Sequence, residues 1–506
     1  MKRLTTSEYI RLNFFQKILY KLACFFAAVF KLFADIGKGI GKGVKGLFKG
    51  IGKDLKDFAT IFAKGSWRTK VSYFIFGFGN LACGQIVRGL LFLLFQVAFI
   101  GYTINIGAGW MAKLDNLGDI GAHEEYSPIY DSYVRVDGDD SFKIMLYGVL
   151  SLILCLVFIF VWRMSFHQSY ENDQLLAKGK KVPKFKDDLR EIVDAKFHKT
   201  LLTIPIIGIS MFTVFPTLFM VLVAFTNYDG AHDGYSNLYT WNGWKNFSEL
   251  FNTTSSNLSY AFKHILGWTL VWAVFATFSN YFLGMLLAIL INKKGIKLKK
   301  LWRGIFVMTI AIPQFISLLY MSKLFAKNGL INAFLIKMGF LSVPFDFWAN
   351  TLASRILLIV INIWIGVPYL MLIATGILMN IPEDLYESAK IDGANPWQQY
   401  TKITLPYMLF ITGPYLLTSF IGNINNFNVV YLLGGSAVPN PKLLTSGGTA
   451  SDVDLLITWL FKITTGTESN YKLASVIGIM IFIVVSIISV IGFNAMPSTK
   501  NEEDFQ

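Results

Sequence analysis

Two apolar stretches of the chain carry uncharged polar side chains at helical spacing. Within each stretch these side chains recur at intervals of four and three residues, so they share one face of a helix. The positions are Ser419, Asn423 and Asn426 in the stretch 408–430, and Asn362, Gly366 and Tyr369 in the stretch 353–378. Asn and Ser both donate and accept hydrogen bonds, and they bring no charge that must be desolvated. The pattern favours a path for a neutral, hydroxylated molecule such as a sugar.

The same side chains have a structural alternative. Polar residues in membrane bundles often hydrogen-bond across neighbouring helices, and they are costly in a membrane without a partner or a function. Cross-linking of helices and contact with a substrate would both explain the spacing, and the residues alone leave both explanations open.

The rest of the chain predicts a membrane protein. It has 506 residues, of which 54% are hydrophobic and only 15% charged, and its mean hydropathy is +0.50. A membrane-spanning helix needs roughly 20 apolar residues. About eight such runs occur, at 85–106, 144–162, 201–225, 266–292, 304–324, 353–378, 408–430 and 472–494. Because a bilayer core cannot satisfy open backbone groups, these runs should be helices, and the expected fold class is an all-α integral membrane protein.

Charge in the connecting loops predicts the orientation. The loop 163–200 and the segment KKGIKLKKLWR are rich in Lys and Arg, which accumulate on the cytoplasmic side. The segment 107–143 is acidic, and 226–265 has few cations. We therefore expect a multi-pass protein of the cell membrane with both termini in the cytoplasm.

The N-terminal arm is basic and amphipathic. The stretch DIGKGIGKGVKGLFKGIGKDLKDFATIF places apolar residues at helical spacing and lysines on the other side. This pattern predicts a helix that lies in the membrane interface, although a disordered basic tail is the alternative. The formal charge of +14 is concentrated in this arm and the cytoplasmic loops, which indicates membrane lipid rather than nucleic acid as the partner.

A polar segment, IPEDLYESAKIDGANPWQQYTKITLP, spans residues 381–406 between the sixth and seventh predicted spans. Acidic residues after Pro382 suit a helix start, and a short helix should run from Leu385 to Ile391. Gly393 is free to adopt a left-handed conformation that ends it. A second helix should run from Pro396 to Thr404, with Pro406 separating it from the next span. The product is a compact cytoplasmic knob suited to docking another protein.

The same segment resembles the EAA---G---------I-LP loop of bacterial ABC-importer membrane subunits. The matching positions are Glu387, Ser388, Ala389, Gly393, Ile403, Leu405 and Pro406. Ser388 is the only departure, and it is mild. The resemblance implies that this loop forms coupling helices held in a cleft of a separate ATPase subunit, since no P-loop signature occurs in this chain.

The resemblance extends from about residue 70 to the C-terminus and narrows to the larger, F-type membrane subunit of maltose/maltodextrin ABC importers. The stretches that carry it are FPTLFMVLVAFTNYDG, AIPQFISLLY, VINIWIGVPYLM, SFIGNINNFNVVYLL and SGGTASDVDLLITWLFKIT. It implies a sugar-binding set at Gln314, Asn362, Ile365, Gly366, Tyr369, Ser419, Asn423 and Asn426. Gln314 stands where the family offers a small hydroxyl, and Gly422 where it offers an aromatic ring. These departures suggest a re-shaped pocket.

The resemblance also implies the domains and the partners. We expect an arm at 1–70, two spans with their loops at 71–200, a six-span permease core at 201–496 that contains the coupling loop, and a tail at 497–506. The implied partners are a second, homologous permease subunit, two ATPase subunits, an extracellular sugar-binding protein and the sugar. No cofactor is expected on this chain, because ATP and Mg would bind the partner ATPase subunits.

Other functions are possible on the residues alone. A secondary transporter would show ionisable residues inside its spans, and the predicted spans have almost no acidic residue. An intramembrane glycosyltransferase would need an acidic, metal- or phosphate-binding cluster. The scattered acids of 107–143 have no such spacing. We therefore expect a transport subunit rather than an enzyme, for maltodextrins or for another oligosaccharide or glycoside.

Overall fold

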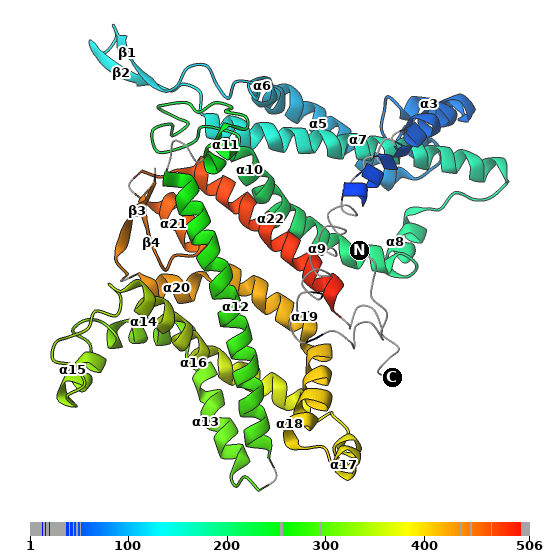
Figure 1. Ribbon diagram of the computed structural model, residues 1–506. Coiled ribbons are helices and arrows are strands. Elements are labelled where there is room, and N and C mark those ends of the chain that lie inside the picture. Colours follow the sequence, from blue (N-terminus) through cyan, green and yellow to red (C-terminus); the bar gives the residue numbers. More distant parts are fainter. Residues whose placement is uncertain are drawn as a thin grey trace. The chain divides into compact units, whose positions relative to one another are not determined.

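The computed structural model describes most of the chain (Figure 1). The described residues are 13, 16, 20, 37–39, 41–43, 45–46, 49–50, 52–252, 257–293, 295–435, 437–445, 448–466 and 468–496. The chain divides into two compact units. The first comprises residues 1–220 with 234–241, and the second comprises residues 221–233 with 242–506. The segment boundaries predicted at residues 70, 200 and 496 divide the chain differently from these two units, and they remain predictions.

The first unit is mainly helical, with one short hairpin. Its elements are α3 (Trp67–Ser72), α4 (Phe78–Ala82), α5 (Ile86–Tyr102), η1 (Thr103–Gly107), α6 (Ala108–Ala112), β1 (His123–Ser127), β2 (Ser132–Val136), α7 (Ser141–Ala177), α8 (Phe185–Val193), α9 (Phe197–Ile209), η2 (Ser210–Val214) and α10 (Phe215–Val223), whose last three residues belong to the second unit. The elements labelled η are π-helical turns. Strands β1 and β2 pair antiparallel, with His123 opposite Val136. This hairpin accounts for part of the acidic segment 107–143.

The core of the first unit joins α3 and α7 to the end of the N-terminal arm. Residues 52–64 are helical. Phe58 packs on the buried cluster of Ile61, Tyr73 and Phe166, and the Tyr73 hydroxyl donates to the Phe58 carbonyl oxygen at 2.8 Å. The end of the predicted amphipathic arm thus packs on protein. The apolar positions that define the rest of that prediction, Ile40, Val44, Leu47, Phe48 and Ile51, lie outside the described residues.

The second unit contains the remaining spans. Its elements are α11 (Lys245–Phe251), α12 (Asn257–Asn292), α13 (Lys299–Ala311), α14 (Gln314–Leu324), α15 (Leu330–Lys337), α16 (Thr351–Leu378), α17 (Glu383–Ile391), α18 (Pro396–Gln399), η3 (Tyr400–Thr404), α19 (Leu405–Ile424), α20 (Phe427–Gly434), β3 (Pro439–Thr445), β4 (Gly448–Ser451), α21 (Leu456–Thr465) and α22 (Tyr471–Ala495). The long helix α12 packs along α16 and α19 (Figure 1). Strands β3 and β4 form a second antiparallel hairpin.

The prediction of about eight membrane-spanning helices is confirmed. Seven helices in the described part of the chain are long and apolar enough to cross a membrane. Helices α13 and α14 pass the same test as a pair and count as an eighth span if they are taken as one; they bend by 88° between Ala311 and Gln314. Pro313 precedes α14 and has no N–H to continue the helix. The fifth predicted span, 304–324, is therefore broken rather than straight.

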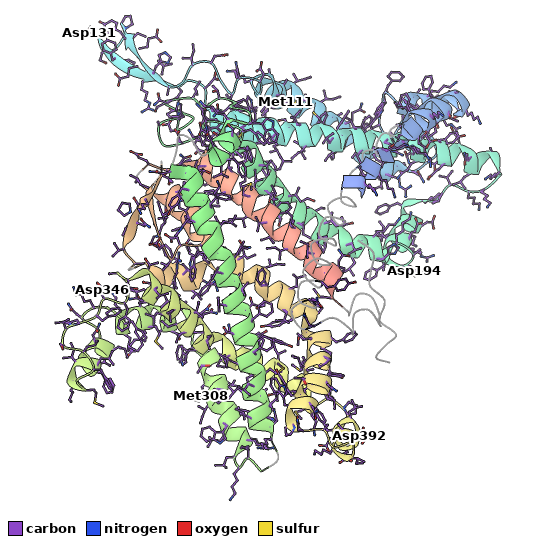
Figure 2. The ribbon with its side chains drawn as sticks, in the orientation of Figure 1. Met111, Asp131, Asp194, Met308, Asp346 and Asp392 are labelled. Atoms are coloured by element: carbon purple, nitrogen blue, oxygen red, sulfur yellow. The ribbon has the colours of Figure 1, made fainter. Side chains whose placement is uncertain are left out.

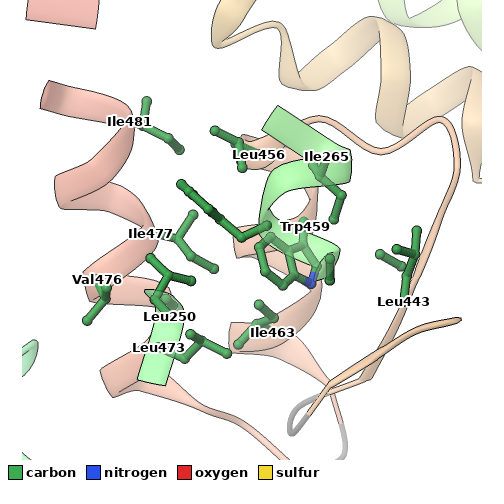
Figure 3. Close-up of a cluster of buried hydrophobic side chains, with 14 of the residues drawn as sticks. Leu250, Ile265, Leu443, Leu456, Trp459, Ile463, Leu473, Val476, Ile477 and Ile481 are labelled. Carbon is green, nitrogen blue, oxygen red and sulfur yellow. The ribbon is translucent and has the colours of Figure 1, made fainter. Parts of the chain in front are cut away.

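A buried apolar cluster holds α12, α21 and α22 together (Figure 3). Ile265 of α12, Trp459 of α21 and Ile477 of α22 are each no more than 1% exposed. The short helix α21 therefore packs against two spans instead of forming a free surface loop.

We predict that Ile477→Ala destabilises the protein by about 2 to 5 kcal/mol, because it leaves a cavity in this cluster. Ile483→Ala, on the same helix but with a side chain 41% exposed, is the matched control and should have a much smaller effect. Thermal unfolding of the purified protein in detergent measures both. Equal effects of the two variants would contradict the packing described.

Candidate functional site

Helix α12 brings together the two polar groups that the sequence predicts on different spans. From α19, the Asn423 Nδ2 atom donates to Thr277 Oγ1 of α12 at 2.9 Å. The Trp272 Nε1 atom of α12 donates to the Asn423 carbonyl oxygen at 3.1 Å. Asn423 therefore cross-links two helices. The sequence left this structural role open as an alternative to contact with a substrate.

Asn426 lies beyond a break in the helix. The prediction that Ser419, Asn423 and Asn426 share one continuous helix face is wrong, because α19 ends at Ile424 and α20 begins at Phe427. Asn426 accepts a hydrogen bond from the Val429 N–H at 3.3 Å and so caps α20. Its Nδ2 atom donates to Asn423 Oδ1 at 3.2 Å, which keeps the two amides together.

The group on α16 faces a residue that the sequence analysis did not select. Asn362 is 5% exposed, and its Nδ2 atom has no hydrogen-bond partner among the described residues. The Oδ1 atom of Asn280, on α12, is likewise buried without such a partner. The Asn280 amide lies so close to Gly366 that a Cβ placed there would be 2.2 Å from Asn280 Nδ2. The available signal for Asn280 was an amide in the middle of the apolar run 266–292, whose other amide, Asn292, stands at its end.

The other predicted positions differ in their surroundings. Tyr369 is 51% exposed, and both Tyr369 and Ser419 lie near Tyr415. Ile365 is partly buried and packs on a hydrophobic cluster. Gln314 is exposed at the start of α14, next to the bend in the fifth span, and α14 packs on α20. No contact described here joins Gln314 to the other predicted residues.

Both broken spans carry polar residues at the break. Gln314 follows the bend between α13 and α14, and Asn425 and Asn426 separate α19 from α20. Non-helical backbone at membrane depth is tolerated only where it is buried in protein or lines a water-filled cavity. The breaks and the unpartnered amides therefore suit a path through which a polar molecule passes.

The loop 381–406 forms the expected knob of two short helices. Gly393 has φ of +77°, in the left-handed region, and ends α17 as predicted. Asn395 caps α18, because its Oδ1 atom accepts from the Gln398 N–H at 2.8 Å. Tyr386 of α17 hydrogen-bonds Thr404 of η3 through their hydroxyl oxygens at 2.9 Å. These contacts fix the angle between the two helices.

The predicted separation at Pro406 is wrong. Helix α18 continues through the π-helical turn η3 into α19, and residues 396–434 qualify as one span. A proline in a regular helix loses a hydrogen bond and crowds the preceding turn. Pro406 instead falls in the first turn of α19, directly after the wider π turn. The knob is consequently joined to the seventh span without a break.

The coupling residues lie partly on the outer surface of the knob. Glu387, Ser388, Gly393 and Pro406 are exposed, and Ala389, Ile403 and Leu405 are partly buried. The knob also exposes large apolar side chains, with Ile391 at 86% and Trp397 at 70%. Asp392, at the end of α17, lies between them in sequence (Figure 2). An exposed apolar patch rimmed by polar residues is typical of a protein-binding surface.

A polar cluster fastens the segment after β4 to the ends of two spans. Asp452 accepts hydrogen bonds from Thr351 at 2.9 Å and Asn440 at 2.9 Å, and contacts His264 at 3.0 Å. Burial opposes ionisation of Asp452. The two hydrogen bonds and the charges of His264 and Arg355 outweigh it and hold the pKa of Asp452 below its ordinary value. These contacts hold the segment after β4 against the two spans. No metal-binding group of three or more His, Cys, Asp or Glu side chains occurs in the described residues.

These features describe a multi-pass membrane component with two broken spans, buried amide atoms that lack a partner among the described residues, and a knob of two short helices continuous with one span. Residues 280–497 match the family described as the binding-protein-dependent transport system inner membrane component. The maltodextrin transport system permease protein MdxF of Bacillus subtilis is 32% identical over 84% of this chain and 95% of its own length. The chain belongs to this family of membrane-spanning transport components.

Of two other relatives, one is named for a different sugar and one for maltose and maltodextrin. The galactooligosaccharides transport system permease protein GanP of Bacillus subtilis is 30% identical over 84% of this chain and 96% of its own length. The maltose/maltodextrin transport system permease protein MalF of Escherichia coli is 33% identical over 50% of this chain and 48% of its own length.

We predict that Gly366→Ala lowers the midpoint of thermal unfolding, because the new Cβ forces the Asn280 amide away from α16. In an Asn280→Ala background the same substitution should cost less, with an interaction energy of about 0.5 to 3 kcal/mol. Gly376→Ala on the same helix is the control, since a Cβ there meets nothing within 4 Å. Strict additivity of Gly366→Ala and Asn280→Ala would contradict the contact.

Proposed function

We propose that this chain is the larger membrane subunit of an ATP-driven importer for maltose and maltodextrins. The observation that carries the proposal is the combination of a family relationship over most of the chain with a docking knob continuous with α19. The likeness to the galactooligosaccharide permease at nearly the same identity makes galacto-oligosaccharides the second candidate substrate. Both candidates are neutral, hydroxylated molecules of the kind that the amides of the path suit.

The proposed assembly contains four kinds of subunit. This chain pairs with a second, homologous permease, two ATPase subunits that bind ATP and Mg dock on the knobs, and an extracellular binding protein delivers the sugar. The chain lies in the cell membrane with both termini and the knob in the cytoplasm. The basic loop 163–200 supports this orientation. The chain itself performs no catalysis.

The proposed path uses residues from four helices, α14, α16, α19 and α20. The sugar contacts three residues of α16, which are Asn362, Gly366 and Tyr369. It also contacts Ser419 and Asn423 of α19 and Asn426 at the start of α20. Ile365 and Gln314 border it. A sugar hydroxyl would accept a hydrogen bond from the Asn362 Nδ2 atom, which has no partner among the described residues. A sugar drives the transport cycle only through its different affinity for the outward-facing and inward-facing states.

The substrate is tested by ATP hydrolysis. With the complex in lipid vesicles and the binding protein present, maltotriose and longer maltodextrins should stimulate hydrolysis, and galacto-oligosaccharides and an unrelated sugar should not. Stimulation by galacto-oligosaccharides alone would keep the importer and replace its substrate. A complex that takes up maltodextrin without its ATPase subunits would refute the importer itself.

The docking role is tested on the knob. Gly393→Val and Glu387→Lys should leave membrane insertion intact and abolish sugar-stimulated hydrolysis, because both change the surface that meets the ATPase. Gly339→Val is the matched control: Gly339 has nearly the same φ of +78° and also has open space around it, but it lies after α15, outside the knob. Loss of hydrolysis in the Gly339 variant too would show that backbone strain, not docking, causes the defect.

A further inference from the structure

Helix α8 (Phe185–Val193) presents an uncovered apolar face. Phe185, Leu189, Ile192 and Val193 are between 43% and 67% exposed. Their spacing places them on one side of the helix. Soluble surfaces rarely leave such a face open, and a contiguous exposed patch usually marks an interaction site.

The helix is nevertheless held in place at both ends by polar contacts. Before it, the buried Gln85 donates from Nε2 to the Pro183 carbonyl oxygen at 2.8 Å. After it, the Lys196 N–H donates to the Glu191 carbonyl oxygen at 2.6 Å, and Thr200 Oγ1 donates to the Ile192 carbonyl oxygen at 3.1 Å. The position of α8 is thus fixed without the use of its apolar face.

The charges around α8 are unequal on its two sides. At 100° per residue, Lys186 and Arg190 border one edge of the apolar face and Asp188 borders the other, while Asp187 and Glu191 lie on the opposite side. Residues 178–199 contain eight Lys and Arg and four Asp and Glu. Two cations along one edge of an apolar face, in a segment with an excess of cations, match a helix that lies at an anionic lipid surface.

A candidate membrane span begins next to α8. Only Asp194 to Lys196 separate α8 from α9, which starts the span Phe197–Val223, and Asp194 marks this turn (Figure 2). Leu201, in the first turns of α9, is 60% exposed, as expected of a lipid-facing side chain. The apolar face of α8 therefore lies a few residues from the start of an apolar span.

We propose that α8 is an interfacial anchor that binds anionic lipid. Its apolar side chains insert below the headgroups, and Lys186 and Arg190 reach lipid phosphates. Each cation near an anionic membrane surface strengthens binding about fivefold. Because α8 is fastened to the first turn of α9, the lipid beneath α8 sets the depth at which this span enters the membrane.

Spin labels on the full chain test the burial of α8. With Cys24, Cys83 and Cys155 replaced by Ser, labels are attached at Leu189→Cys and Ile192→Cys, with Glu191→Cys as the control on the opposite side. The ion pair lost in the control is exposed and contributes little. In phospholipid nanodiscs, the first two labels should collide more with oxygen than with a water-soluble nickel chelate, and the control should do the reverse. Preferential collision with nickel at both test positions, or shielding from both reagents by protein, would overturn the proposal.

The lipid headgroup is tested separately. Adding phosphatidylglycerol to phosphatidylcholine should move the Leu189 label deeper, and Lys186→Gln with Arg190→Gln should abolish that shift. Lys178→Gln with Lys180→Gln removes the same charge outside α8 and should preserve it. If the Leu189 label lies at the same depth in both lipids when Lys186 and Arg190 are unchanged, the preference for anionic lipid is overturned.

Discussion

The close packing of α12 against α16 and α19 is the constraint on which the second unit depends. Helices in lipid are not driven together by the hydrophobic effect, so they rely on small residues and on hydrogen bonds between them. Gly284 of α12 lies so near Leu370 of α16 that a Cβ at Gly284 would be 2.8 Å from the Leu370 Cβ. On the other side, Tyr281 hydrogen-bonds Thr412 of α19 at 2.9 Å. One helix therefore fixes the spacing of both walls that carry the predicted sugar-binding residues.

The same helix explains why structure and transport are hard to separate at this site. Thr277 and Asn280 lie one turn apart on α12. Thr277 has a hydrogen-bond partner, Asn423, on α19. The Oδ1 atom of Asn280 has no partner among the described residues. An amide that cross-links helices in one state can bind a hydroxyl in another, since the exchange replaces one hydrogen bond by another of similar strength. The two explanations for the polar faces need not compete.

Local patterns predicted the spans and the knob, and tertiary interactions decided the rest. Hydropathy located all eight runs because burial in lipid is a property of each segment alone, and Gly393 and Pro396 marked the knob through backbone preferences. The break at Asn425 was not predicted, because the amides on either side keep a helical spacing that hides it. Asn280 was missed because no second amide follows it at helical spacing in the middle of its span, and its importance appears only when α16 lies beside it. The apolar face of α8 was likewise visible in the sequence, but its isolation from other helices was not.

The π-helical turn Tyr400–Thr404 inserts about one extra residue between the knob and the seventh span. Every side chain of α18 is therefore turned by about 100° around the axis relative to an uninterrupted α-helix leading into α19. The direction in which Trp397 and its neighbours point is thus set by a single residue of chain length. An insertion or deletion at residues 400–404 would change the orientation of the proposed docking surface while leaving α18 and α19 intact, so this turn sets the register between the two helices.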